Sequence, residues 1–97
     1  ETNLVNDVPE LDEVEASVRV YPNPVRDVVT FELDGWDGPF QWTLRDAAGR
    51  TVDAGRGHSR EGARFEGRIP VGHLPAGMHM LILQQGEYTV RKRIVVF

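Results

Sequence analysis

The chain has 97 residues, of which 40% are hydrophobic and 27% are charged, with a net charge of −4 and no cysteine. This length accommodates one domain with a small core, and the composition is typical of globular proteins rather than disordered ones. The lack of cysteine excludes disulfide scaffolds and thiolate sites, and no apolar run approaches the length of a membrane-spanning helix. Because the chain starts at Glu1 without a leader, we expect it to be a fragment of a longer protein.

The charges divide the chain at residue 16. Residues 1–16 contain six acidic residues and no basic one, whereas residues 17–97 contain nine acidic and eleven basic residues. A composition step of this kind marks a boundary. We therefore expect residues 1–16 to be a flexible acidic linker outside the fold and residues 17–97 to be the folded domain.

From residue 17 onward, apolar and polar residues alternate, and turn residues recur every eight to twelve positions. This pattern predicts strands at residues 17–21, 25–33, 40–46, 50–54, 63–70, 77–85 and 88–97. Residues 55–62, which contain three glycines, are expected to be the least regular stretch. Seven strands without a helical period predict an all-β, immunoglobulin-like antiparallel β-sandwich, with a small barrel as the alternative.

Several positions have expected places in this fold. Trp42 alternates in phase with core residues and should be buried, whereas Trp36 lies in a turn and could be buried or exposed. Residues 77–85 form the most apolar strand, which should be central. Residues 46–49 suit a type I turn in which Gly49 takes a positive φ.

The sequence offers no residues arranged for catalysis or cofactor binding. Ser17 and Ser59 lack a nucleophile elbow, and the three histidines are scattered without zinc spacing. The aspartates of residues 34–38 lack the pattern of a calcium loop, and the basic run 91–93 alternates across a strand instead of forming one patch. We therefore expect no enzyme activity, cofactor, metal or nucleic-acid partner.

Three segments, in this order, resemble one family. They are residues 20–24 (VYPNP), residues 44–52 (LRDAAGRTV), and residues 74–81 (LPAGMHML) followed by residues 91–96 (RKRIVV). Together they are similar to the type A C-terminal sorting domain of the type IX (Por) secretion system of Gram-negative bacteria, over residues 18–97. The residues that carry the resemblance are Tyr21, Pro22, Asn23, Pro24, Asp46, Gly49, Leu74, Gly77, Arg91, Lys92, Arg93, Ile94 and Val95. His79 and Phe97 depart from the family pattern, which usually has an aromatic residue at the first position and often a basic or small residue at the second.

The resemblance implies a sorting signal at the C-terminus of a larger secreted protein. The expected partners are the outer-membrane translocon, shuttle and sortase-like peptidase of that system, and the cargo domain that precedes the signal on the same precursor. The domain would be a monomer without a membrane span. It would pass through the periplasm to the cell surface or the medium, and the peptidase would cut within residues 1–16.

The motif residues also have physical roles. Pro22 and Pro24 fix φ and lack an N–H, so the first strand must end there in a rigid kink. Leu74 is expected to anchor its loop inward, and Gly77 to allow a bulge at the start of the central strand.

The last strand has two different faces. Ile94 and Val96 should be buried, while Arg91 and Arg93 share the opposite face with Val95 and Phe97. These arginines would be recognised by a partner or would only protect an edge strand from pairing.

The alternative function is that of a carbohydrate-binding or fibronectin-like accessory module of a secreted polysaccharide-degrading enzyme. In that case Trp36 would stack on a sugar ring, with Tyr88 as a second aromatic residue. A plain spacer domain is a third possibility.

Overall fold

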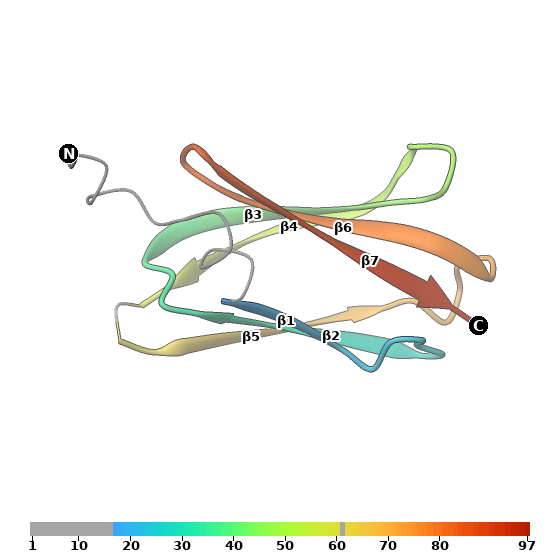
Figure 1. Ribbon diagram of the computed structural model, residues 1–97, viewed down its shortest axis with the longest axis horizontal. Coiled ribbons are helices and arrows are strands. Elements are labelled where there is room, and N and C mark those ends of the chain that lie inside the picture. The colour runs from blue at the N-terminus through green and yellow to red at the C-terminus, as the bar shows by residue number, and fades with distance from the viewer. Residues whose placement is uncertain (1–16, 61) are drawn as a thin grey trace, which may run out of the picture.

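The computed structural model describes residues 17–60 and 62–97, so the expected linker and cleavage region lie outside the described residues. Seven strands form two layers (Figure 1). They are β1 (Val18–Tyr21), β2 (Val28–Asp34), β3 (Gly38–Arg45), β4 (Thr51–Ser59), β5 (Arg64–Pro70), β6 (Gly77–Gln85) and β7 (Tyr88–Val96). Within the described part of the chain, no helix has the length and apolar character needed to cross a membrane.

The two layers are antiparallel sheets with the strand orders β1-β2-β5 and β4-β3-β6-β7. The predicted all-β fold with seven strands in a sandwich is confirmed. The most apolar predicted strand is β6, which pairs with both β3 and β7 and is central as expected. β7 lies at the edge of the four-stranded sheet, so among the residues that the structure describes no other complete strand pairs with its outer side.

The core forms where the inner faces of the two sheets meet. Alternate residues of each strand point inward, and their side chains include Phe31, Leu33, Leu44, Leu81 and Ile94, all with 2% exposure or less. Each large apolar side chain buried in this way contributes about 1.5–3 kcal/mol to stability. The ring of Phe31, in β2, packs against the rings of Phe40 and Trp42 in β3 of the opposite sheet and against Phe65 in β5 of its own sheet. Aromatic contacts therefore join the two layers.

The strand β4 is longer than the sequence predicts. Residues 55–59 were expected in an irregular stretch, but they belong to β4 and pair with β3. Gly55 lies under the ring of Trp42, and Gly57 lies under the ring of Phe40. A Cβ atom at Gly55 would lie 2.6 Å from the Trp42 ring, and one at Gly57 would lie 2.4 Å from the Phe40 ring. These glycines therefore make room for the buried ring of Phe40 and for the half-buried ring of Trp42, which packs against the core, so here glycine does not break the strand.

Candidate recognition surface

All three sequence motifs contribute to one end of the sandwich, on the right in Figure 1. Residues 22–27 link β1 to β2, residues 46–50 link β3 to β4, and residues 71–76 link β5 to β6 at this end, where β7 also ends. The strand register places Arg45, Met80 and Arg93 in one row across β3, β6 and β7. Segments that are distant in the sequence are thus neighbours in the fold, which sequence reasoning did not predict.

The first motif is bonded directly to the last strand. The side-chain amide of Asn23 donates to the Arg93 carbonyl at 2.7 Å, and its oxygen accepts from the Val95 N–H at 2.9 Å. Val25 continues this contact as a parallel bridge: its N–H donates to the Val95 carbonyl at 2.8 Å, and its carbonyl accepts from the Phe97 N–H at 2.9 Å. The Asn23 side chain therefore replaces a neighbouring strand along the outer edge of β7.

Tyr21, the second residue of the same motif, is bonded within its own three-stranded sheet. Its hydroxyl donates to Oε2 of Glu32, a residue of β2 that is only 8% exposed. This hydrogen bond to a carboxylate raises the pKa of Tyr21 above its ordinary value, because the bond is lost when the hydroxyl ionises. Nothing in the sequence indicates this role of Glu32, because the residue occupies an alternating polar position that normally faces water.

The second motif forms the tight turn between β3 and β4. The Asp46 carboxylate accepts from the Arg50 and Ala48 N–H groups at 2.9 and 3.0 Å and from the Arg50 guanidinium at 3.0 Å. These bonds, chiefly that from the Arg50 backbone, lower the pKa of Asp46. Gly49 has a φ of 87°, so the expected positive-φ position is confirmed.

The third motif leads into the central strand. Leu74 is half-buried against the core, in agreement with its expected inward direction. Gly77 has a φ of 132°, but its pairing with Val96 is regular from the first residue of β6. The expected bulge at Gly77 was therefore wrong, because the positive φ serves the turn into the strand. The register shift of this sheet lies between Leu44 and Arg45 instead.

The last strand has the two faces that its alternation predicts. Ile94 and Val96 are buried in the sandwich. Arg91 and Arg93 are exposed on the opposite face, together with Val95 at 37% and Phe97 at 63% exposure. Lys92 is half-buried, on the same side of the strand as Ile94. The guanidinium of Arg26, in the first loop, lies 5.2 Å from the centre of the Phe97 ring.

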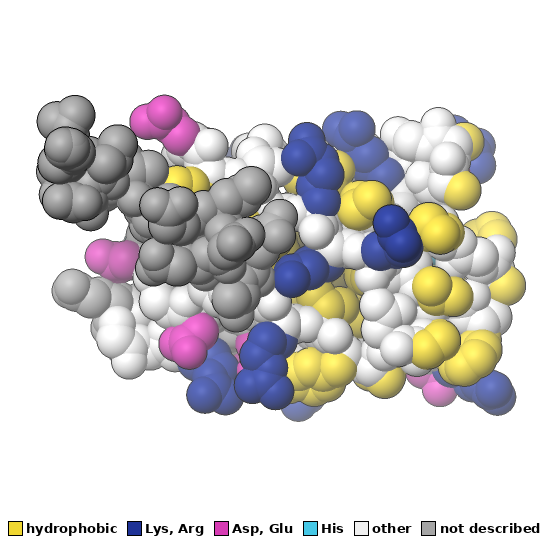
Figure 2. All heavy atoms as spheres, viewed as in Figure 1, with side chains coloured by type: hydrophobic (Ala, Val, Ile, Leu, Met, Phe, Trp, Pro, Cys, Tyr) yellow, Lys and Arg dark blue, Asp and Glu magenta, His cyan; other side chains and the backbone are white. Residues whose placement is uncertain are grey.

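The outer faces of the two sheets differ in their charges. Figure 2 shows basic side chains over the middle and right of the four-stranded sheet at the top of the molecule and an acidic one at its left end, whereas acidic and basic side chains touch along the bottom. Arginines of the three-stranded sheet form ion pairs with Glu32 and Glu66 at N–O distances of 3.5–3.9 Å. Among residues 17–60 and 62–97, no such pair involves Arg91 or Arg93.

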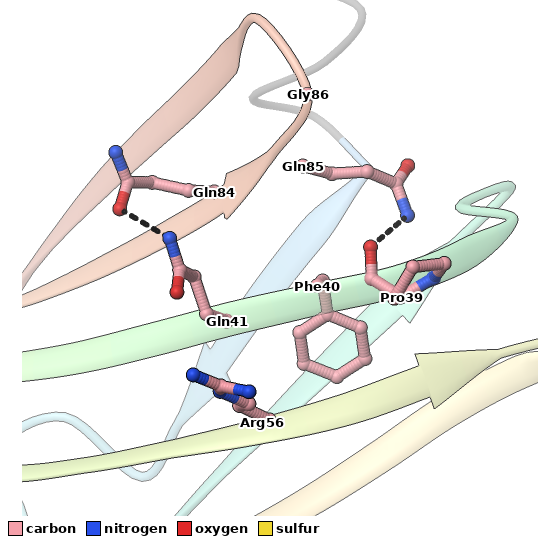
Figure 3. A pocket seen from close by; sticks show the side chains of 7 residues that line it. All are labelled: Pro39, Phe40, Gln41, Arg56, Gln84, Gln85 and Gly86. Atoms are coloured by element: carbon pink, nitrogen blue, oxygen red, sulfur yellow. Dashed lines mark hydrogen bonds between the residues drawn. The ribbon is translucent and has the colours of Figure 1, made fainter.

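A shallow hollow of about 280 Å³ lies at the opposite end of the four-stranded sheet. Its lining residues are Pro39, Phe40, Gln41, Arg56, Gln84, Gln85 and Gly86. Figure 3 shows the amides of Gln41 and Gln84 bonded across β3 and β6 at 3.3 Å, and Gln85 bonded to the Pro39 carbonyl at 3.2 Å. The hollow contains none of the sorting-motif residues, and its one aromatic ring, Phe40, is buried in the core.

Trp36 also lies at that opposite end, between β2 and β3. It is 6% exposed, its ring packs edge-on against Phe40, and its Nε1 donates to the Ser17 hydroxyl at 2.8 Å. Stacking on a sugar needs an open ring face. The indole is covered in this conformation, so the carbohydrate-binding alternative gains no support from the structure. In the described part of the chain, no three potential metal ligands gather.

The fold and this arrangement define a small all-β domain whose distinctive residues form loops and an edge strand at one end of a sandwich. The family model of the secretion system C-terminal sorting domain matches residues 19–97, so the chain belongs to that family, the sorting domain of type IX secretion. No curated protein matches the sequence significantly. Domains of this family are sorting signals rather than catalysts, and they direct export across the outer membrane to the cell surface or beyond.

Proposed function

We propose that residues 17–97 are the sorting signal of a larger precursor and that the export machinery recognises the motif end of the sandwich together with the exposed face of β7. The observation that carries the proposal is the bonding of Asn23 to Arg93 and Val95. It makes the first motif and the last strand parts of one folded surface. Recognition of such a surface requires the folded domain, not a linear peptide.

The sequence of events starts with the folded domain in the periplasm. The outer-membrane translocon and its shuttle bind the domain and carry the cargo that precedes it on the same chain. A sortase-like peptidase then cuts within residues 1–16, after which the cargo is attached to the surface or released. A cut in this acidic segment is supported by its position next to the fold, where proteases act most readily. The domain acts as a monomer with no cofactor.

The test is a fusion of residues 1–97 to a periplasmic reporter, expressed in a bacterium with the type IX system and in the same strain without its translocon. We expect the reporter at the cell surface or in the medium only when the translocon is present. Mass spectrometry of the exported reporter should find its new C-terminus within residues 1–16. A reporter that stays in the periplasm, or leaves equally well without the translocon, contradicts the proposed function.

The role of β7 is tested in the same assay with two double variants. Replacement of Arg91 and Arg93 by alanine should sharply reduce export, because exposed arginines beside an apolar strip are typical anchors for a partner. Replacement of Arg56 and Arg60, which are exposed in and directly after β4 at the end of the sandwich opposite the motifs, is the matched control and should preserve export. If the first variant is exported like the parent, the arginines of β7 only protect the edge.

A further inference from the structure

The outer edge of β7 is closed along one half only. In an antiparallel ladder, alternate residues direct both backbone groups toward the neighbouring strand or away from it. Asn23 and Val25 form hydrogen bonds with the Arg93 carbonyl, with both backbone groups of Val95 and with the Phe97 N–H. The odd-numbered residues of β7 therefore direct their backbone N–H and C=O groups toward the outer edge. The same alternation leaves both groups of Thr89 and Arg91, and the N–H of Arg93, on the outer edge, where no strand of residues 17–60 or 62–97 lies beside them.

This open half differs from the other sheet edges. β1 has only four residues, β4 has a register shift in its pairing with β3 and contains Gly55 and Gly57, and β5 ends at Pro70. Short, irregular or proline-containing edges resist pairing with another chain. β7 has nine residues without glycine or proline, and is therefore the edge best suited to accept an added strand.

The charges of β7 indicate which strand fits. Arg91 and Arg93 are exposed on one side of the open edge, and the half-buried Lys92 lies on the other side. A second copy of β7 would bring three more cations against these three, which disfavours self-pairing. An extended segment with carboxylates would instead gain ion pairs from the same side chains.

We propose that the open half of β7, from Thr89 to Arg93, binds an extended acidic segment of the export machinery by strand addition. The added strand would bond the outward groups of Thr89 and Arg91, and its carboxylates would pair with the flanking cations. The path of the added strand ends at Asn23, because the Asn23 side chain already bonds the next outward backbone groups of β7, the Arg93 carbonyl and the Val95 N–H. This inference rests on the proposed function and specifies how the domain is recognised.

The main test compares Thr89→Pro with Thr89→Ala in the reporter fusion. The Thr89 N–H points away from β6, so proline removes an outward donor without breaking the pairing with β6. Loss of one bond of about 1 kcal/mol corresponds to a reduction in export of about fivefold or more. We expect that loss for Thr89→Pro, parental export for Thr89→Ala, and similar thermal midpoints for both purified domains.

A charge test supplies a second answer should Thr89→Pro fail to fold. Arg91→Glu with Arg93→Glu should abolish export, whereas Arg56→Glu with Arg60→Glu makes the same charge change at the opposite end of the sandwich and should leave export intact. Equal loss in both double variants would show that only overall charge matters, and would overturn strand addition.

Hydrogen exchange of the purified 97-residue chain tests the free edge directly. The amides of Thr89, Arg91 and Arg93 should exchange rapidly, while those of Val95 and Phe97 are protected by their bonds. Protection of the first three would mean that residues 1–16 or a second copy already covers the edge, which overturns the proposal. If the parent fusion is exported through the translocon and Thr89→Pro is folded and exported equally, the sorting function stands and strand addition is wrong.

Discussion

The two outer faces of this sandwich use arginine in different ways. On the three-stranded sheet, Arg19 and Arg64 lie 3.9 and 3.7 Å from the buried carboxylate of Glu32, and Arg68 pairs with Glu66. On the four-stranded sheet, Arg91 and Arg93 form no ion pair with any residue of 17–60 or 62–97. Arginines of the first kind have a carboxylate partner within the fold, whereas those of the second remain available to a partner outside it.

This difference depends on the residues opposite each arginine. Arg19 faces Glu32 across β1 and β2. Arg93 and Arg91 instead face Met80 and Ile82 across β7 and β6, so no acidic side chain lies beside them on the neighbouring strand. Cross-strand neighbours of opposite charge stabilise a sheet, and a cation beside apolar residues lacks that contribution. The contrast predicts large effects on stability from one face and small ones from the other.

Among the substitutions, the largest effect is expected from Glu32→Ala. The substitution removes the acceptor of the Tyr21 hydroxyl and the carboxylate that Arg19 and Arg64 share, so stability should fall by about 1–3 kcal/mol. Chemical denaturation of the parent and the variant measures this loss. Glu66→Ala is the control on the same face, because its exposed pair with Arg68 should contribute less than about 1 kcal/mol. Equal losses in the two variants would contradict a central role for Glu32.

The next effect concerns Asn23, which ties the loop of one sheet to the edge strand of the other. Asn23→Ala removes two hydrogen bonds to β7, and stability should fall by about 1–2 kcal/mol. Hydrogen exchange at the Val95 amide should accelerate while that at the Val90 amide stays slow. Asn23→Asp retains the acceptor for Val95 and loses the donor to Arg93, so it should have an intermediate effect. An unchanged Val95 amide in Asn23→Ala would refute the bond.

A smaller effect is expected from Tyr21→Phe, which removes only the hydroxyl bonded to Glu32. Because the pKa of Tyr21 is raised in the folded state, its contribution is fully present below about pH 10 and is lost as the pH rises through the folded pKa. The parent should therefore be more stable than the variant at about pH 7, and the difference should shrink at about pH 11. A difference that grows at alkaline pH would contradict this hydrogen bond.

The smallest effect on stability is expected from the double replacement of Arg91 and Arg93 by alanine. Both side chains are exposed and unpaired among the described residues, so the free energy of unfolding should change by no more than about 0.5 kcal/mol. The thermal midpoint measures this change. Removal of residues 94–97 is the contrasting variant, because it deletes the buried Ile94 and Val96 and should unfold the domain. A strongly destabilised arginine variant would place these residues in the fold itself and remove the contrast between the faces.

Sequence reasoning succeeded where a local pattern determines the structure. Period-two alternation predicted the seven strands and the two faces of β7, and the turn chemistry of residues 46–49 predicted the positive φ of Gly49. It failed where a residue acts through a distant partner. The glycines of residues 55–57 suggest irregular structure when read alone, because the rings of Trp42 and Phe40 that fill the space above them come from β3. The burial of Trp36 could not be decided, because a turn position does not show which residues cover the ring.

By itself the sequence determined the fold class, the family and the residues that distinguish it. It could do so because alternation, turn residues and spaced motifs are properties of neighbouring positions. Only the tertiary structure brought the motifs together at one end, bonded Asn23 to a strand 70 residues away, and left half of that strand's edge open. It also decided which arginines have a carboxylate beside them. These features depend on which strands pair and in which register, and contacts between distant segments fix both.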